Sequence, residues 1–250
     1  MDRLTINAAP RPLIDGAPAV SALGWGMWRY HGDDVAAATA RSMAALEAGI
    51  TLFDTADIYG FGHEHGFGAA EALFGRVLKA NPGLRDRIVL ATKGGIQPPI
   101  PYHQRGNRLI ECCEASLRRL NVDCIDLYQV HRPDLLAHPA EIAAALDTLR
   151  RQGKIKAAGV SNYTPAQVAA LSAHLPFPLL SIQPEFSPLH IDPLFDGVMD
   201  QALERGLTVL TWSPLGGGNL LGEAGDERTG RVAAALDAIA TRQGATRAAV

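Results

Sequence analysis

The sequence has few cysteines, no long apolar run and no basic run. Only three of its 250 residues are cysteines, namely Cys112, Cys113 and Cys124. An odd total that includes an adjacent pair argues against a disulfide framework or a zinc site and predicts reduced, structural thiols. No segment has the roughly 18 consecutive apolar residues of a membrane-spanning helix, and the N-terminus lacks the apolar core of a signal peptide. We therefore expect a cytoplasmic protein that does not bind membranes.

The sequence also argues against nucleic acid and a metal ion as binding partners. The formal net charge is −3, and no Lys/Arg run creates a local basic surface, so nucleic acid is a poor candidate partner. The segment His63-Glu64-His65 does not have the i, i+4 histidine spacing of a helical zinc motif. We interpret it as a mobile loop and expect no metal.

With 47% apolar and 20% charged residues, the chain is typical of a globular protein, and we expect residues 1–250 to form a single domain.

Short apolar runs alternate with longer segments of helical periodicity along nearly the whole chain. This alternation is typical of repeated βα units that build a parallel sheet. We predict seven strands, at residues 22–27, 51–54, 88–92, 125–130, 155–160, 179–183 and 207–212. We predict helices at residues 34–48, 69–79, 108–120, 140–152, 165–173, 194–205 and 229–242.

Seven such units without an internal linker favour an α/β fold of the (β/α)8 TIM-barrel class over an open doubly wound sheet. The Rossmann alternative is weakened because the first strand carries G-W-G-M-W at 24–28, with two bulky aromatics, Trp25 and Trp28, where a pyrophosphate would need close backbone approach. An unclosed barrel would leave strand edges unpaired. We therefore expect the chain as given to be C-terminally incomplete, with the last βα unit missing.

Catalytic groups of such barrels gather at the carboxyl ends of the strands. Asp54, Lys93 and His131 end three successive predicted strands, and Tyr59 lies in the loop after Asp54. Each has an ordinary structural explanation by itself: a helix cap, a surface lysine, a loop anchor and a buried histidine. Their common position at one end of the sheet favours a shared catalytic role.

At these residues the chain resembles the aldo-keto reductase family, whose Asp, Tyr, Lys and His fall here on Asp54, Tyr59, Lys93 and His131. The resemblance continues through G-W-G-M-W at 24–28, G-V-S-N-Y at 159–163, I-Q-P at 182–184 and W-S-P-L-G-G-G at 212–218. Within the family, S-N-Y at 161–163 and W-S-P-L at 212–215 are most similar to bacterial oxidoreductases related to the potassium-channel β-subunit branch.

The resemblance implies reduction of an aldehyde or ketone by hydride transfer from NADPH, with NADH as an open alternative. Tyr59 would give a proton to the carbonyl oxygen, and Lys93 would favour the phenolate and so facilitate proton transfer near neutral pH. Asp54 would hold Lys93 charged, and His131 would orient the substrate oxygen.

Other positions would hold the cofactor by the same resemblance. Trp212 would offer a flat face to the nicotinamide ring, and Ser161, Asn162 and Gln183 would bond its carboxamide. The remaining expected contacts, two after the first strand and a glycine-rich loop for the pyrophosphate, are Met27, Trp28, Ser213, Pro214, Leu215, Gly216, Gly217 and Gly218.

Two alternatives to an active reductase stay open at this stage. One is a cofactor-binding, redox-sensing regulatory subunit with slow turnover, and the other is an inactive barrel fragment. The partner that we expect is a small carbonyl substrate, whose identity the sequence does not specify. The oligomeric state is equally open.

Overall fold

The computed structural model describes residues 9–100, 102–223 and 225–250. The chain divides into two compact units, a larger one that ends at residue 182 and a smaller one that begins at residue 183. Within the described residues the neighbouring strands of the sheet follow one another in the order in which they occur along the chain. None of the helices in the described ranges combines the length and the apolar character needed to cross a membrane.

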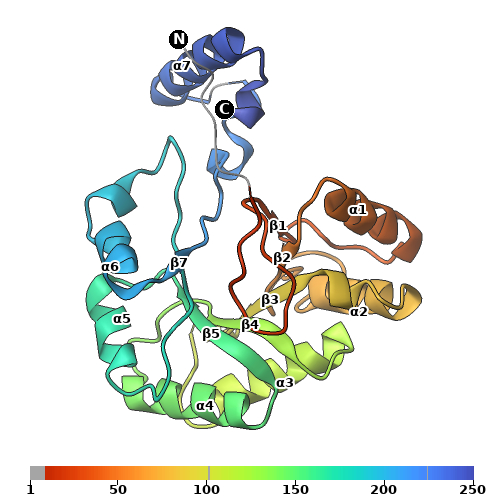
Figure 1. Ribbon diagram of the computed structural model, residues 1–250, viewed down its shortest axis with the longest axis vertical. Coiled ribbons are helices and arrows are strands. Elements are labelled where there is room, and N and C mark those ends of the chain that lie inside the picture. Colours follow the sequence, from red (N-terminus) through yellow and green to blue (C-terminus); the bar gives the residue numbers. More distant parts are fainter. Residues whose placement is uncertain (1–8, 101, 224) are drawn as a thin grey trace. The chain divides into compact units, whose positions relative to one another are not determined.

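The larger unit is built from alternating strands and helices, as the sequence predicts. Its strands are β1 (Gly24–Gly26), β2 (Leu52–Asp54), β3 (Val89–Gly94), β4 (Ile125–Val130) and β5 (Ile155–Ser161). Its helices are α1 (Val35–Glu47), α2 (Ala69–Ala80), α3 (Arg108–Leu120), α4 (Pro139–Arg151) and α5 (Pro165–Ser172). Neighbouring strands from β1 to β5 pair in parallel, and Figure 1 shows the five helices on the outer side of these strands.

Local signals explain several helix boundaries. The Asp34 carboxylate accepts a hydrogen bond from the Ala37 amide and caps α1. Thr164 and Gln167 form a capping box at the start of α5, where Pro165 occupies the first turn. The bounds of these two helices agree within one position with the ranges predicted from the sequence.

Of the elements from residue 181 onward, the first three are shorter than the sequence predicts and the last helix is slightly longer. They are β6 (Ser181–Gln183), α6 (Val198–Arg205), β7 (Thr208–Val209) and α7 (Glu227–Gln243). The prediction that the sixth helix begins at residue 194 is wrong, because Asp192–Leu194 form a separate 3₁₀ turn and Gly197, with a left-handed φ of 86°, caps the start of α6. The seventh strand is reduced to two residues, and Trp212 beyond it forms an isolated parallel bridge with Glu185.

Apolar side chains of the larger unit's strands and helices form its core. Phe53 and Phe74 stack with ring centroids 5.7 Å apart, which joins β2 to α2, and both are fully buried. All three thiols are free. Burial raises the pKa of Cys112 to about 12, which fits the predicted structural role because the unreactive thiol form is favoured.

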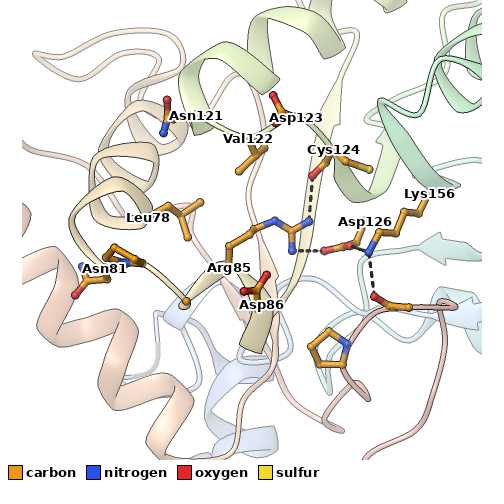
Figure 2. Close-up of a pocket in the computed structure, with 14 residues that line it drawn as sticks. Leu78, Asn81, Arg85, Asp86, Asn121, Val122, Asp123, Cys124, Asp126 and Lys156 are labelled. Carbon is orange, nitrogen blue, oxygen red and sulfur yellow. Dashed lines mark hydrogen bonds and ion pairs between the residues drawn. The ribbon is translucent and has the colours of Figure 1, made fainter.

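A pocket of about 510 Å³ opens at the amino ends of β3, β4 and β5. Asp126 lies at its centre and binds two cations, Arg85 Nη1 at 2.7 Å and Lys156 Nζ at 2.8 Å (Figure 2). Its carboxylate also accepts a hydrogen bond from the Leu90 amide. Because these contacts join three neighbouring strands at the end opposite their carboxyl termini, we assign this ion cluster to stability.

Candidate active site

A buried ion pair joins the carboxyl ends of β2 and β3. Asp54 is the last residue of β2, and Lys93 lies one residue before the end of β3. The Lys93 ammonium donates to Asp54 Oδ2 at 2.6 Å and to the Thr55 carbonyl at 2.8 Å. Strand pairing places Asp54 beside Ala91, two residues before Lys93, so the parallel register brings the two side chains to one face of the sheet.

The surroundings of Lys93 keep it positively charged. Burial lowers the pKa of this amine, but the Asp54 carboxylate and the Tyr59 hydroxyl outweigh burial, and the pKa lies above its ordinary value. The Asp54 carboxylate thus favours the charged form of Lys93.

Tyr59 lies directly against this ion pair. The Lys93 ammonium is 5.2 Å from the centroid of the Tyr59 ring, and the Trp28 ring meets the Tyr59 ring edge-on at 5.0 Å. Burial raises the pKa of the Tyr59 phenol, whereas the charge of Lys93 lowers it, and the net shift is upward. Lys93 thus acts in the expected direction, toward the phenolate, but the desolvation of the buried phenol is the larger effect and leaves the pKa raised.

His131 completes the group from the next strand. It follows β4 and its amide donates to the Gly94 carbonyl at 3.0 Å, while its ring centroid is 6.0 Å from that of Tyr59. Burial, together with the positive charges of Lys93 and Arg132, holds the pKa of His131 well below its ordinary value. The imidazole is therefore neutral at neutral pH and carries one N–H donor and one acceptor.

Four of the expected cofactor residues lie in the larger unit beside this group. The Met27 amide donates to the Asp54 carbonyl, and Trp28 contacts Tyr59 as described above. At the end of β5, Asn162 adopts a left-handed φ of 59°, and its side-chain amide donates to the His131 carbonyl at 3.1 Å and to Ser161 Oγ at 2.9 Å. A hydroxyl and an amide at this strand end match the donors and acceptors of a carboxamide.

The other expected cofactor residues belong to the smaller unit. Trp212 is held by backbone hydrogen bonds with Pro184 and Phe186, and Gln183 is buried at the end of β6. The loop that follows is a succession of turns with left-handed φ at Ser213, Gly216, Gly217 and Gly218. The amides of Gly216 and Gly218 donate to carbonyls of this same loop, those of Ser213 and Leu215, so in this conformation these two amides serve the turns instead of a pyrophosphate. Pro214 and Leu215 lie within the same turns.

A second buried ionic group lies behind Tyr59 and was not found from the sequence. Glu71 is fully buried, forms an ion pair with Arg119 at 2.7 Å and accepts a hydrogen bond from Thr92 Oγ1 at 2.6 Å. Asp57 is also buried, and burial together with the Glu71 carboxylate raises its pKa well above the ordinary value. From the sequence, a carboxylate is predicted at this end of the sheet only in Asp54.

The loop that follows Tyr59 is a series of turns. Gly60 has φ 102°, and a Cβ atom there would lie 2.5 Å from the Gly66 carbonyl and 2.6 Å from Ala69 Cβ. His63 lies in this loop, and its ring stacks on that of His31 with centroids 4.3 Å apart. In the part of the chain that the structure describes, no group of three or more His, Cys, Asp or Glu side chains is arranged to hold a metal ion.

Comparisons with known proteins agree with this geometry. A family model described as the aldo/keto reductase family matches residues 22–250. A 6-dehydroglucose reductase of Novosphingobium aromaticivorans is 51% identical over 249 residues, which cover 99% of this chain and 82% of that protein. A second 6-dehydroglucose reductase, of Agrobacterium fabrum, is 39% identical over 92% of this chain and 78% of that protein.

Solved structures give the same result. A glycerol dehydrogenase from Gluconobacter oxydans superposes with a TM-score of 0.81 at 28% identity, over 97% of this chain and 81% of that one. A thermostable aldo-keto reductase in complex with the inhibitor epalrestat superposes with a TM-score of 0.79 at 27% identity, over 96% of this chain and 82% of that one. The predicted α/β barrel fold class is confirmed. The chain therefore belongs to the aldo/keto reductase family and is an NAD(P)H-dependent oxidoreductase.

Proposed function

We propose that the chain reduces the aldehyde group of an oxidised sugar of the 6-dehydroglucose kind to a primary alcohol, with NADPH as the reductant. Carbonyl reduction follows from the family. The sugar aldehyde is proposed because two relatives, 51% and 39% identical to this chain, carry that activity in their names. NADPH is proposed on the family resemblance stated above.

The contact of Lys93 with both Asp54 and Tyr59 is the observation that carries the mechanism. When bound, the reduced nicotinamide supplies the hydride that reaches the carbonyl carbon. Tyr59 donates its hydroxyl proton to the carbonyl oxygen, on which negative charge develops. Its raised pKa keeps the phenol protonated at neutral pH, which is the form that the reductive direction requires.

Lys93 and His131 serve the same oxygen in different ways. The Lys93 ammonium stabilises the phenolate that remains after proton transfer, and Asp54 holds the ammonium in place. Neutral His131 donates a hydrogen bond to the carbonyl oxygen and fixes its direction. Because the imidazole carries no charge, this role depends on its position beside Tyr59, with ring centroids 6.0 Å apart.

Ser161, Asn162, Gln183 and Trp212 are proposed to bind the nicotinamide. The hydroxyl and amide groups at the end of β5 suit the carboxamide, and the indole offers a flat apolar face to the ring. Met27 and Trp28 are proposed as further cofactor contacts in the larger unit. The loop 213–218 would approach the pyrophosphate with few side chains in the way.

Oxidation of NADPH and of NADH, followed by absorbance with 6-dehydroglucose, hexanal and a ketone, tests the proposal on the full chain. The variant Tyr59→Phe should lose about 10²–10⁴-fold in turnover and should keep its affinity for NADPH in a fluorescence titration. Tyr102→Phe is the matched control, because Tyr102 is partly exposed. Full activity of Tyr59→Phe would overturn the assignment of the proton donor. Slow turnover by the wild type with every carbonyl would favour a regulatory, cofactor-binding subunit.

A further inference from the structure

Two histidines stack beside the candidate active site. His31 lies in the segment between β1 and α1, and His63 lies in the segment between β2 and α2. Their rings are nearly parallel, with centroids 4.3 Å apart and an interplanar angle of 17°. His63 is exposed and His31 is half-buried, so the pair lies at the surface, where a ligand can reach it.

The same two segments carry Trp28 and Tyr59. Trp28 precedes His31 by three residues, Tyr59 precedes His63 by four, and the two aromatic rings are themselves in edge-on contact at 5.0 Å. The two segments therefore contact each other at two places: Trp28 contacts Tyr59, the proposed proton donor, and His31 contacts His63. Trp28 is 58% exposed, so the indole, like the histidine pair, is open to solvent.

Neither imidazole has its polar atoms engaged by the protein. Among the described residues, neither ring takes part in a hydrogen bond or an ion pair. A neutral imidazole presents one N–H donor and one nitrogen acceptor, and a hydroxyl group can both donate and accept. Two adjacent imidazoles thus offer two donors and two acceptors to neighbouring hydroxyl groups.

We propose that His31 and His63 together determine specificity for polyhydroxylated aldehydes, by hydrogen bonding to hydroxyl groups of the substrate away from its reacting carbonyl. The inference rests on the proposed function, because it concerns how a sugar aldehyde is held in the site of Tyr59. A site that pairs its polar groups with substrate hydroxyls discriminates strongly against an analogue that lacks them. An unhydroxylated aldehyde of equal length gains nothing from the pair.

Phenylalanine substitutions separate hydrogen bonding from stacking. His31→Phe and His63→Phe keep a flat ring that can stack and remove both nitrogens. His65→Phe is the matched control, because His65 is an exposed histidine of the same loop. Steady-state kinetics are measured with 6-dehydroglucose and with hexanal, which has the same number of carbon atoms and no hydroxyl groups.

Each of the two variants should lower kcat/KM for the sugar aldehyde by about tenfold, which corresponds to the loss of one or two hydrogen bonds, mainly through a higher KM. The value for hexanal should stay unchanged, and His65→Phe should behave as the wild type with both substrates. Equal losses with both aldehydes would show that the pair only holds the loops and would overturn the inference, as would an unchanged value for the sugar.

The wild-type measurement separates this inference from the proposed function. If the wild type reduces hexanal but not 6-dehydroglucose, the proposed substrate class is wrong and the inference fails with it. If the wild type reduces the sugar and the two variants do so equally well, the inference alone is overturned and the proposed function stands.

Discussion

Lys93 Nζ lies 2.6 Å from Asp54 Oδ2, and the two side chains are only 2% and 12% exposed. Both charged groups lose their hydrating water on burial, and the main interaction that replaces it is the attraction between them. A buried pair of this kind costs little when both partners are replaced, and it costs a great deal when one partner is removed.

Lys93→Met should therefore destabilise the protein strongly, by about 3–5 kcal/mol, since it leaves the Asp54 carboxylate without its cation. Adding Asp54→Asn should recover much of this loss, because the second change removes the uncompensated charge. Urea unfolding of the two single variants and the double variant measures the coupling, with the exposed Lys79→Met as control. Equal destabilisation of Lys93→Met and the double variant would contradict the argument. Lys93→Met and the double variant should both lose carbonyl reduction.

The kcat/KM for reduction should not change with pH near neutrality. The pKa of Tyr59 lies above its ordinary value because the phenol is buried, and that of His131 lies well below its own, again chiefly through burial. Reduction needs protonated Tyr59 and neutral His131, so kcat/KM should stay level between about pH 6.5 and pH 10, the ordinary values of the two groups. Alcohol oxidation needs the phenolate and should accelerate toward alkaline pH.

Rates in both directions across this range provide the measurement. A steep fall of the reductive rate between pH 7 and pH 8 would show a phenol titrating well below its ordinary value of about 10, contrary to the burial of this side chain. Tyr102→Phe, which changes an exposed phenol, should leave both profiles unaltered.

Gly94 has no room for a side chain. A Cβ atom there would lie 2.0 Å from Tyr128 Oη and 3.1 Å from Cys112 Cβ. Gly94→Ala should thus destabilise by about 1–3 kcal/mol, the usual cost of overpacking. Tyr128 Oη is buried and has no hydrogen-bond partner among the described residues, so Tyr128→Phe alone should be neutral or stabilising.

The combination tests the cause of the strain. Gly94→Ala/Tyr128→Phe should regain most of the lost stability in thermal unfolding, because the clashing hydroxyl is gone. If the double variant is as unstable as Gly94→Ala, the strain comes from the backbone or from Cys112 and the explanation by Tyr128 is wrong.

The parts of the site that follow from strand ends could be predicted from the sequence. Asp54, Lys93 and His131 each come at the end of a short apolar run, and parallel strands bring such ends together whatever the details of packing. Helices with strong local caps, such as α5 behind Thr164, were predictable for a similar reason, because the determining contacts lie within a few residues.

Properties set by contacts between distant residues could not be predicted in this way. The direction of the Tyr59 pKa shift depends on how completely the folded chain buries the phenol. The ion pair of Glu71 with Arg119 joins residues 48 positions apart, and the stack of His31 on His63 joins two irregular segments. No periodicity in the sequence marks such pairs, since each is fixed by the packing of two separate βα units.

The pH dependence of stability tests how burial affects the protonation of Asp57. Burial and the neighbouring Glu71 carboxylate raise its pKa, against the smaller opposing effect of Arg119. The folded state therefore holds the proton to a higher pH than the unfolded state, whose carboxyl titrates near pH 3.9. The stability that the neutral acid provides is fully present below that pH and is lost as the pH rises through the folded-state pKa.

Asp57→Asn keeps the shape of the side chain and removes its titration. The variant should be close to the wild type in melting temperature near pH 4 and more stable than the wild type near pH 8, where the wild type carries the cost of keeping Asp57 neutral or of burying its charge. The exposed Asp123→Asn is the control and should show no such divergence with pH. A constant difference between Asp57→Asn and the wild type across this range would mean that the carboxyl titrates alike in both states, which its burial behind Tyr59 argues against.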